Sequence, residues 1–193
     1  FHAIPFTLPY MLILTPYVLG GIGIWIITMI VRRRNRGVLI WAAVTYIVTF
    51  GLEVLGVATG AVFGSYVYGD VLGLKMWGVP LIIGFNWVLV ILGAVIFARR
   101  FVSNPLLVSL IVGAAAFLFD FILEPVAIRL GYWNWSGGVI PIRNYLSWFA
   151  IAFLAALTYN LSGLKTETVV PMYYVGIQIL FFVVLRFVVS EVV

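Results

Sequence analysis

The stretch "VPLIIGFNWVLVILGAVIFA", residues 79–98, contains no charged residue and is followed at once by Arg99 and Arg100. At about 1.5 Å per residue, a helix of this length crosses a hydrocarbon core of about 30 Å. The whole chain has the same character, since 65% of its 193 residues are hydrophobic and 9% are charged. Soluble domains do not have this composition, so the sequence predicts an integral membrane protein.

Five further stretches share this length and apolar character. Together the six predict helices over residues 7–31, 38–60, 79–98, 104–128, 142–161 and 169–190. No linker, low-complexity segment or convincing repeat divides the chain, so we predict an all-α integral membrane protein, a bundle of about six transmembrane helices that forms a single domain over residues 1–193. Because the chain begins with Phe1 and not with methionine, we allow for a seventh helix ahead of it.

The basic residues gather in three of the predicted loops. Residues 32–36 ("RRRNR"), residues 99–100 and Lys165 hold seven of the eleven lysines and arginines. Six helices place these loops on one side of the membrane, and the positive-inside rule makes that side cytoplasmic. We therefore predict a multi-pass protein of the cell membrane with both ends of this chain outside. The pI near 9.7 then reflects topology, and we predict no nucleic-acid partner.

Cysteine and histidine are nearly absent from the sequence. The chain has no cysteine, and its single histidine, His2, lies at the start. This excludes disulfides, thiolate metal sites and cysteine nucleophiles, and one terminal histidine does not build a histidine-rich metal site. The prediction for a metal site is therefore none.

Three carboxyl groups and one amide inside the predicted spans lie toward the outer side. Glu53, Asn86 and Asp120 are each about seven or eight residues from the outer end of their helices, roughly 10–12 Å below the surface. Glu124 lies one turn nearer the surface on the same face as Asp120. Ionisable groups within a membrane are costly and mark functional sites by default, so we predict a closed polar pocket in the outer half of the bundle.

The chemistry of that pocket depends on its carboxyl groups. An apolar pocket disfavours the charged form of a carboxyl, and a second carboxyl nearby disfavours it further. One acid is therefore expected to stay protonated at neutral pH and to serve as a proton donor. The alternative is structural, with Glu124 paired to Arg129 or Arg143 and Asp120 holding helices together by hydrogen bonds.

Pro125 follows Glu124 directly. Proline cannot donate a hydrogen bond to the carbonyl of Phe121, and it disfavours helical geometry at the residue before it. The sequence leaves two outcomes open at this point. Either the helix loosens there and its freed carbonyl binds water or a neighbouring side chain, or the helix simply ends.

The predicted outer loops are rich in aromatic residues. Residues 61–78 and 129–141 hold Tyr66, Tyr68, Trp77, Tyr132, Trp133 and Trp135. An aromatic belt at the membrane interface explains some of them. It does not explain why the basic side is poor in tryptophan and tyrosine, so we predict that the outer face is functional.

Four ordered motifs carry a resemblance to a known family. They are "TGAVFGSYVYGDVLGLKMWGVPLIIGFNW" (59–87), "FDFILEPVA" (119–127), "GYWNW" (131–135) and "GVIPIRNYLSW" (138–148). Over roughly half its length the chain resembles the membrane carotenoid-biosynthesis protein family, which includes carotenoid hydratases of haloarchaea and bacteria. The resemblance implies a non-redox hydro-lyase that adds water across the terminal C1–C2 double bond of an acyclic carotenoid, with carotenoid, water and membrane lipid as its partners.

Hydration of such a double bond assigns roles to the polar residues. A strong acid must protonate the alkene, and water then captures the tertiary carbocation. Asp120 or Glu53 is expected to be the acid, and Glu124 and Asn86 are expected to orient the water. No metal, flavin or nicotinamide is needed, because nothing is oxidised, and we predict no cofactor.

Aromatic faces and fifth-helix side chains complete the predicted site. Aromatic rings stabilise a carbocation, and the candidates for this cage are Tyr66, Trp77, Trp87, Trp133 and Trp148. Arg143 and Asn144 are expected to hold the acid network from the fifth helix, or else to lie at the membrane interface. Gly84, Gly93 and Gly113 let helices, or a polyene, approach closely.

Two other functions compete with hydration. A lycopene-type cyclase uses the same acid but captures the cation within the molecule, and the sequence alone does not exclude it. A small-molecule transporter would show paired broken helices in symmetric positions, whereas only the fourth helix looks broken. The chain length of the carotenoid, the number of ends that react and the oligomeric state are not determined by the sequence.

Overall fold

A computed structural model describes residue 2 and residues 4–188, and the chain forms six α-helices within this part. They are α1 (Leu8–Arg32), α2 (Arg36–Thr59), α3 (Leu81–Ala98), α4 (Pro105–Arg129), α5 (Ile142–Leu161) and α6 (Val170–Val188). The helix bounds lie within two residues of those predicted, except that the predicted end of the last helix, at residue 190, lies outside the described residues. All of these helices except α5 meet the length and composition of a membrane span. The prediction of an all-α membrane bundle is confirmed.

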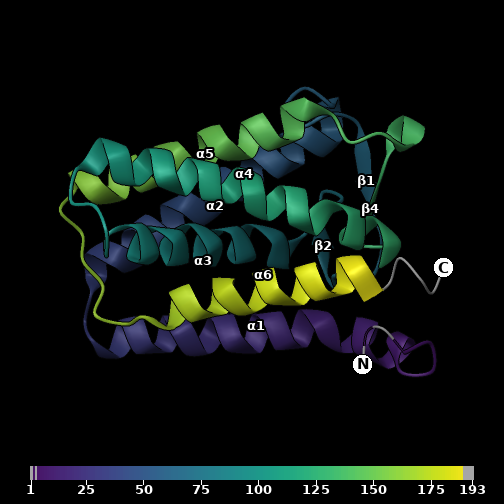
Figure 1. Ribbon diagram of the computed structural model, residues 1–193, viewed down its shortest axis with the longest axis horizontal. Helices are drawn as coiled ribbons and strands as arrows, with labels where there is room; N and C mark the ends of the chain where they lie inside the picture. Colours follow the sequence, from purple (N-terminus) through teal and green to yellow (C-terminus); the bar gives the residue numbers. More distant parts are fainter. Residues whose placement is uncertain (1, 3, 189–193) are drawn as a thin grey trace.

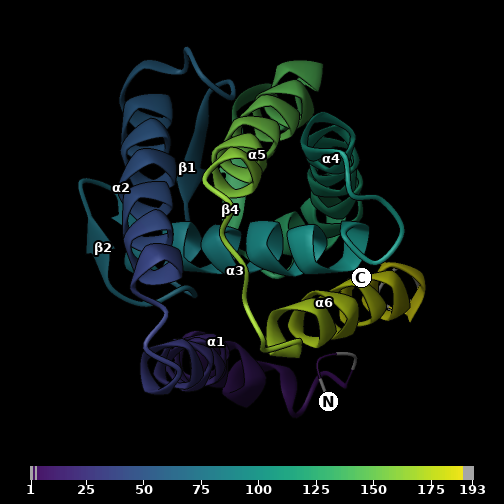
Figure 2. The same cartoon turned by 90° about the vertical axis from the view of Figure 1, so that its left-hand side faces the viewer.

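Helix α3 forms the centre of the bundle. It crosses the molecule with α2, α5 and α4 on one side and α1 and α6 on the other (Figure 2), and it contacts each of the other five helices. Small residues suit α3 to this position, because Gly84 and Gly93 let neighbouring helices approach it closely. Leu89, Ile91 and Leu92 of α3 are completely buried.

Asparagine and glycine set several helix ends. The Asn104 side chain accepts a hydrogen bond from the Leu107 amide (3.0 Å), and Pro105 occupies the first turn of α4. Asn35 caps α2 in the same way. Gly60 caps the C-terminus of α2, and its φ of 66° is left-handed and favours glycine.

Three glycines allow the close helix contacts that the sequence predicts. A Cβ atom on Gly93 of α3 would lie 2.4 Å from the carbonyl oxygen of Pro171 in α6. A Cβ on Gly113 of α4 would lie 3.0 Å from the Phe149 carbonyl oxygen in α5. At Gly84 the nearest atom would be Cβ of Phe50, at 3.1 Å. Helix packing, rather than contact with a polyene, therefore accounts for all three glycines.

Gly93→Ala should destabilise the protein, whereas Gly176→Ala should not. The new methyl group at Gly93 meets backbone of α6, which cannot move aside as a side chain does, so we expect a loss of about 1–3 kcal/mol. Nothing lies within 4 Å of a Cβ on Gly176, and alanine there should gain up to about 1 kcal/mol. Thermal unfolding in detergent, followed by circular dichroism, measures both; equal Tm values would contradict this account of the α3–α6 contact.

Helix α4 continues through Pro125 and ends at Arg129, so the reading of Pro125 as a helix end is wrong. The carbonyl oxygen of Phe121, which loses its helical donor to the proline, accepts a hydrogen bond from Nη1 of Arg186 in α6 (3.1 Å). The guanidinium also lies 5.0 Å from the centre of the Phe121 ring. A neighbouring helix thus satisfies the polar group that the proline frees, which lets the helix persist in an apolar environment.

The basic loops meet at one end of the bundle. Arg33 forms an ion pair with Glu167. The Asn35 side chain donates to the Lys165 carbonyl (2.5 Å), and Arg99 donates to the carbonyl of Leu164 (2.5 Å). The loops that carry the arginines and Lys165 therefore lie together, and we call this end the arginine-rich end.

The opposite end carries two small antiparallel sheets, in segments that the sequence predicts to be loops. Strand β1 (Tyr66–Tyr68) pairs with β4 (Trp133–Trp135), and β2 (Lys75–Met76) pairs with β3 (Val79–Pro80). In the first sheet Tyr66 lies opposite Trp135, and Tyr68 lies opposite Trp133. Figure 1 shows β1 and β4 side by side across the end of the bundle, and a short 3₁₀ turn, Ser136–Gly138, follows β4.

Candidate active site

The β1–β4 sheet turns one face toward the helices. Side chains alternate along a strand, so Tyr66, Tyr68, Trp133 and Trp135 share the inner face. Val67, between the two tyrosines, is 62% exposed. The four inner side chains each donate a hydrogen bond to a glutamate buried in the bundle. The sheet thus closes over two of the predicted acids.

The tyrosines of β1 bind Glu53 of α2. The hydroxyl groups of Tyr66 and Tyr68 both donate to Oε2 of Glu53, the second at 2.8 Å. Burial raises the pKa of both tyrosine hydroxyls above the ordinary value. The hydroxyls therefore keep their protons and remain donors to the glutamate.

The tryptophans of β4 bind Glu124 of α4. Their indole nitrogens donate to Oε2 at 2.9 Å from Trp133 and at 2.8 Å from Trp135. The other oxygen, Oε1, accepts from Nδ2 of Asn144 in α5 at 3.0 Å. Glu124 is 2% exposed, and hydrogen bonds, rather than an ion pair with Arg129 or Arg143, hold it in place.

Asp120 lies one turn from Glu124 and is also 2% exposed. Nδ2 of Asn144 donates to Oδ2 of Asp120 as well as to Glu124. One amide group therefore joins the two carboxyls of α4. This is the role in the acid network that the sequence predicts for Asn144.

Arg143 has a different position. Its Nη2 atom donates to the carbonyl oxygen of Gly60 at 2.7 Å, which is the C-terminus of α2. A cation at a helix C-terminus is favourable. Arg143 thus ties α5 to α2 outside the cavity described next.

A small polar cavity lies between these acids. Its volume is about 30 Å³, which is room for one or two water molecules. Every predicted acid and water-orienting residue lines it, together with four of the predicted aromatic residues and Asn144; the set is Glu53, Asn86, Asp120, Glu124, Tyr66, Trp87, Trp133, Trp148 and Asn144. None of the described residues that line it is basic, so the acids face no cation there.

Two predicted residues are not brought to the cavity. Arg143 is one, as described. Trp77 is the other, since it lies in the turn between β2 and β3 with 72% of its surface exposed and a φ of 52°. Its loop folds away from the acids because residues 75–80 form a separate sheet.

A stack of aromatic rings forms one wall of the cavity. The rings of Trp87 and Trp148 are nearly parallel with centroids 3.6 Å apart, and Phe63 stacks on Trp148 at 5.0 Å. Phe119 packs edge-on against Trp87 at 5.8 Å. The stack holds α3 and α5 together and places two indole rings beside the acids.

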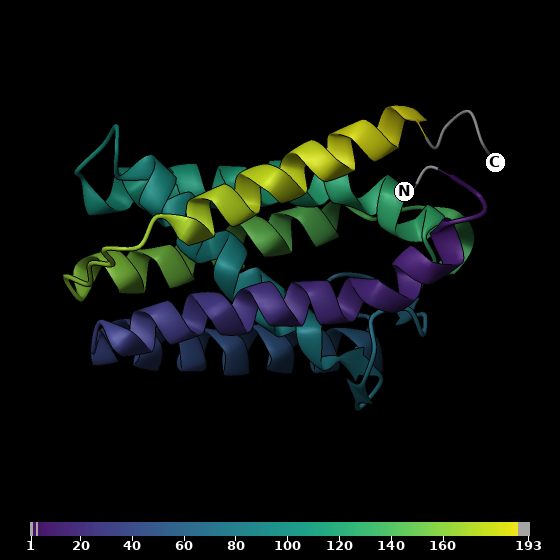
Figure 3. The ribbon, with the colours of Figure 1, turned by 90° about the horizontal axis from the view of Figure 1, so that it is seen from below.

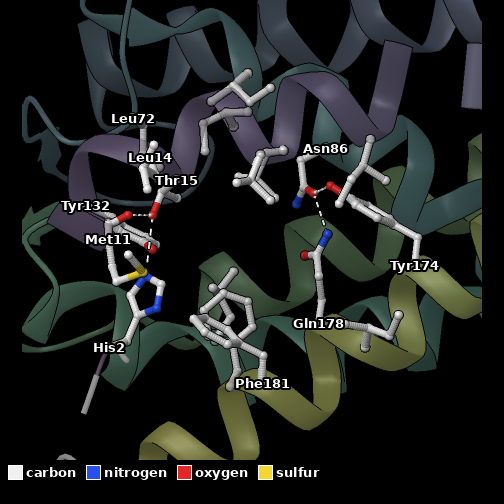
Figure 4. A pocket seen from close by; sticks show the side chains of 18 of the residues that line it. His2, Met11, Leu14, Thr15, Leu72, Asn86, Tyr132, Tyr174, Gln178 and Phe181 are labelled. Atoms are coloured by element: carbon white, nitrogen blue, oxygen red, sulfur yellow. Dashed lines mark hydrogen bonds between the residues drawn. The ribbon is translucent and has the colours of Figure 1, made fainter. Parts of the chain in front are cut away.

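An apolar groove adjoins the acid cavity. It has a volume of about 580 Å³ and lies between α1 and α6, with α3 and α4 as its floor (Figure 4). Four residues line both spaces and form a thin partition between them: Ile83, Asn86, Leu123 and Trp133. The acid cavity is therefore separated from the groove by single side chains.

Comparison with known proteins shows the family of this chain. The family model described as "Carotenoid biosynthesis protein" matches residues 4–193. The chain belongs to the carotenoid biosynthesis protein family. It is also 28% identical over 141 residues to bisanhydrobacterioruberin hydratase of Haloarcula japonica. That match covers 66% of this chain and 45% of the relative, so the chain spans less than half of that protein. No solved structure matches this chain significantly.

The structure places four further residues at the acids or at Asn86. The sequence predicts Tyr68 and Trp135 only as aromatic residues of the outer loops, whereas each donates a hydrogen bond to an acid. On α6, Tyr174 and Gln178 donate to Oδ1 of Asn86 at 2.6 and 2.8 Å (Figure 4). A glutamine inside an apolar span, four residues after a tyrosine, was the available signal for this pair.

Proposed function

We propose that the protein is a carotenoid hydratase that adds water across the terminal C1–C2 double bond of an acyclic carotenoid. One observation carries this proposal: a water-sized cavity lined by three carboxyl groups shares a wall with an apolar groove. A hydrocarbon end group and a water molecule need to meet at an acid, and the two adjoining spaces suit one reactant each. Family membership and the hydratase relative support the same chemistry.

Hydrogen bonding favours Asp120 as the proton donor. Glu124 accepts three N–H donors and Glu53 accepts two O–H donors, whereas Asp120 accepts one bond, from an amide shared with Glu124. Donated hydrogen bonds stabilise a carboxylate, and a neighbouring carboxylate disfavours a second charge. The proton of the cluster therefore resides on Asp120 in this proposal.

The reaction then balances without a cofactor. Asp120 gives its proton to C2, the π bond breaks, and the positive charge forms at the tertiary carbon C1. Water held by Glu124 and Asn86 forms a bond to C1, and its surplus proton passes to a carboxylate of the cluster. The product is a tertiary alcohol. The net change is the addition of one water molecule, because the proton lost by the water replaces the one that Asp120 gave to C2.

The walls of the cavity suit the intermediate cation. The carboxylates of Glu53 and Glu124 supply negative charge that is already fixed in place. Trp87, Trp133 and Trp148 supply aromatic surfaces beside it. Because the donors of the sheet hold both glutamates, no rearrangement of the acids is needed as charge develops.

The positive-inside rule completes the proposal by orienting the protein. The arginine-rich end faces the cytoplasm, and the β1–β4 sheet and the acid cavity lie toward the opposite side.

The decisive experiment supplies the substrate in labelled water. Cells or membranes that contain the protein and a lycopene-type or bisanhydrobacterioruberin-type carotenoid should yield a product heavier by one water, with its new oxygen derived from H₂¹⁸O. Mass spectrometry of the extracted carotenoids measures this. Membranes without the protein serve as the control. A ring-containing isomer of unchanged mass would identify a cyclase and overturn the proposal.

A further inference from the structure

We propose that the groove between α1 and α6 is the binding channel for the polyene chain, entered sideways from the lipid, with the reacting end group at the partition of Ile83, Asn86, Leu123 and Trp133. This inference rests on the proposed function, since it names where that substrate lies. It follows from the shape of the groove, its polarity and its continuity with the acid cavity.

The groove is long and narrow. Along α1 its lining residues recur every third or fourth position from Met11 to Trp25, and along α6 they do so from Val170 to Phe182. Such spacing makes one stripe on each helix, and at about 1.5 Å per residue the stripes are roughly 18–21 Å long. Figure 3 shows α1 and α6 as separate rods with α3 crossing behind them. A rod-shaped ligand fits this space better than a compact one.

Several polar groups of the groove already have partners within the protein. Nε2 of His2 lies 3.5 Å from Oγ1 of Thr15, which also bonds to the hydroxyl of Tyr132. Further along, Asn86 accepts from Tyr174 and Gln178. A ligand therefore need not satisfy these groups, which suits a pure hydrocarbon, because a buried polar group is costly only when it is unpaired.

Asn86 connects the groove with the acid cavity. Its Oδ1 atom is occupied by the two donors from α6, so the hydrogens of its amide nitrogen remain available. Asn86 lines both spaces. It can thus donate toward the acids or the reacting water while α6, one wall of the groove, fixes its orientation.

The rim of the groove opens toward lipid. Ile177, on the α6 stripe, is 68% exposed, and Ile47, on α2 and outside both spaces, is also 68% exposed. These two isoleucines are matched in residue type, helical context and exposure. The difference that this comparison uses is that Ile177 lines the groove and Ile47 does not.

Thiol labelling tests the channel without requiring turnover. The natural chain has no cysteine, so Ile177→Cys and Ile47→Cys each introduce one thiol, in the Asp120→Asn background. Lycopene at about ten times its Kd should slow labelling of the Ile177→Cys thiol about tenfold by occupying the site. Labelling of Ile47→Cys should not change. Equal effects at both thiols, no effect at Ile177→Cys, or equal protection by added phospholipid alone would overturn the proposal.

A bulky pair of variants gives a second measurement. Ile177→Trp should reduce the amount of lycopene that copurifies with the Asp120→Asn protein, whereas Ile47→Trp should leave it unchanged. Equal retention by both would count against the channel. The two proposals can fail separately. If the protein makes a ring isomer but lycopene protects the Ile177→Cys thiol, only the hydratase proposal is overturned. If it makes the water adduct and that thiol is not protected, only the proposal of the binding channel is overturned.

Discussion

Asp120→Asn should lower carotenoid hydration by about 10²–10⁴-fold, the usual contribution of a positioned general acid. The side chain keeps its shape, and its amide oxygen can still accept the hydrogen bond from Asn144. What it loses is the proton that the alkene needs. The variant should therefore insert into the membrane and unfold at a Tm close to that of the parent protein, while product formation in an extract assay nearly disappears.

The matched control for this variant is Asp70→Asn. Asp70 is exposed and forms an ion pair with Lys75 at 2.7 Å, away from the acid cavity. Exposed pairs of this kind contribute little to stability, so turnover and Tm should both stay near normal. Near-normal turnover in Asp120→Asn would show that Glu53, or another group, supplies the proton.

Glu124→Leu should be the most destabilising single change at the site. It removes the acceptor for the indole N–H groups of Trp133 and Trp135 and for the amide of Asn144. Each buried donor left without a partner costs about 1–3 kcal/mol. The sum is several kcal/mol against a total stability of about 5–15 kcal/mol, so little folded protein should be recovered after extraction in detergent.

Two comparisons test whether the loss of stability comes from the lost acceptor and not from the introduction of leucine. Glu124→Gln keeps an acceptor oxygen and should lose much less stability than Glu124→Leu. Glu167→Leu makes the same substitution at an exposed residue, whose partner Arg33 is also exposed, and Tm should hardly change. If Glu124→Leu unfolded at the same Tm as Glu167→Leu, the β1–β4 sheet would not depend on this glutamate.

The local sequence was sufficient to predict the helices. A run of about twenty apolar residues has one low-energy arrangement in lipid, because a helix satisfies its own backbone hydrogen bonds. The helical rise then relates residue number to depth, which is why Glu53, Asn86 and Asp120 were expected at one level. They do line one cavity. This part of the site could be predicted because the apolar length and the rise of each helix do not depend on its neighbours.

The predictions were incomplete where a contact joins distant segments. Strand β1 meets β4 across 65 or more residues of chain, and neither segment carries a strong strand signal alone. Arg186 satisfies the carbonyl freed by Pro125 from another helix, so the proline does not end α4. Trp77 and Arg143 have the residue types expected of a site, but the turn of β2–β3 and the end of α2 hold them elsewhere.

Hydrophobicity and helical rise are properties of short segments, so the class of protein, the helix bounds and the grouping of Glu53, Asn86 and Asp120 could be predicted from the sequence. Which donors reach which acid depends on the tertiary structure. Three donors, from β4 and α5, converge on Glu124, whereas Asp120 accepts a hydrogen bond from the amide of Asn144. The groove is likewise a property of how α1 and α6 pack around α3. Hydrogen bonds and cavities depend on relative positions of helices, which no single segment specifies.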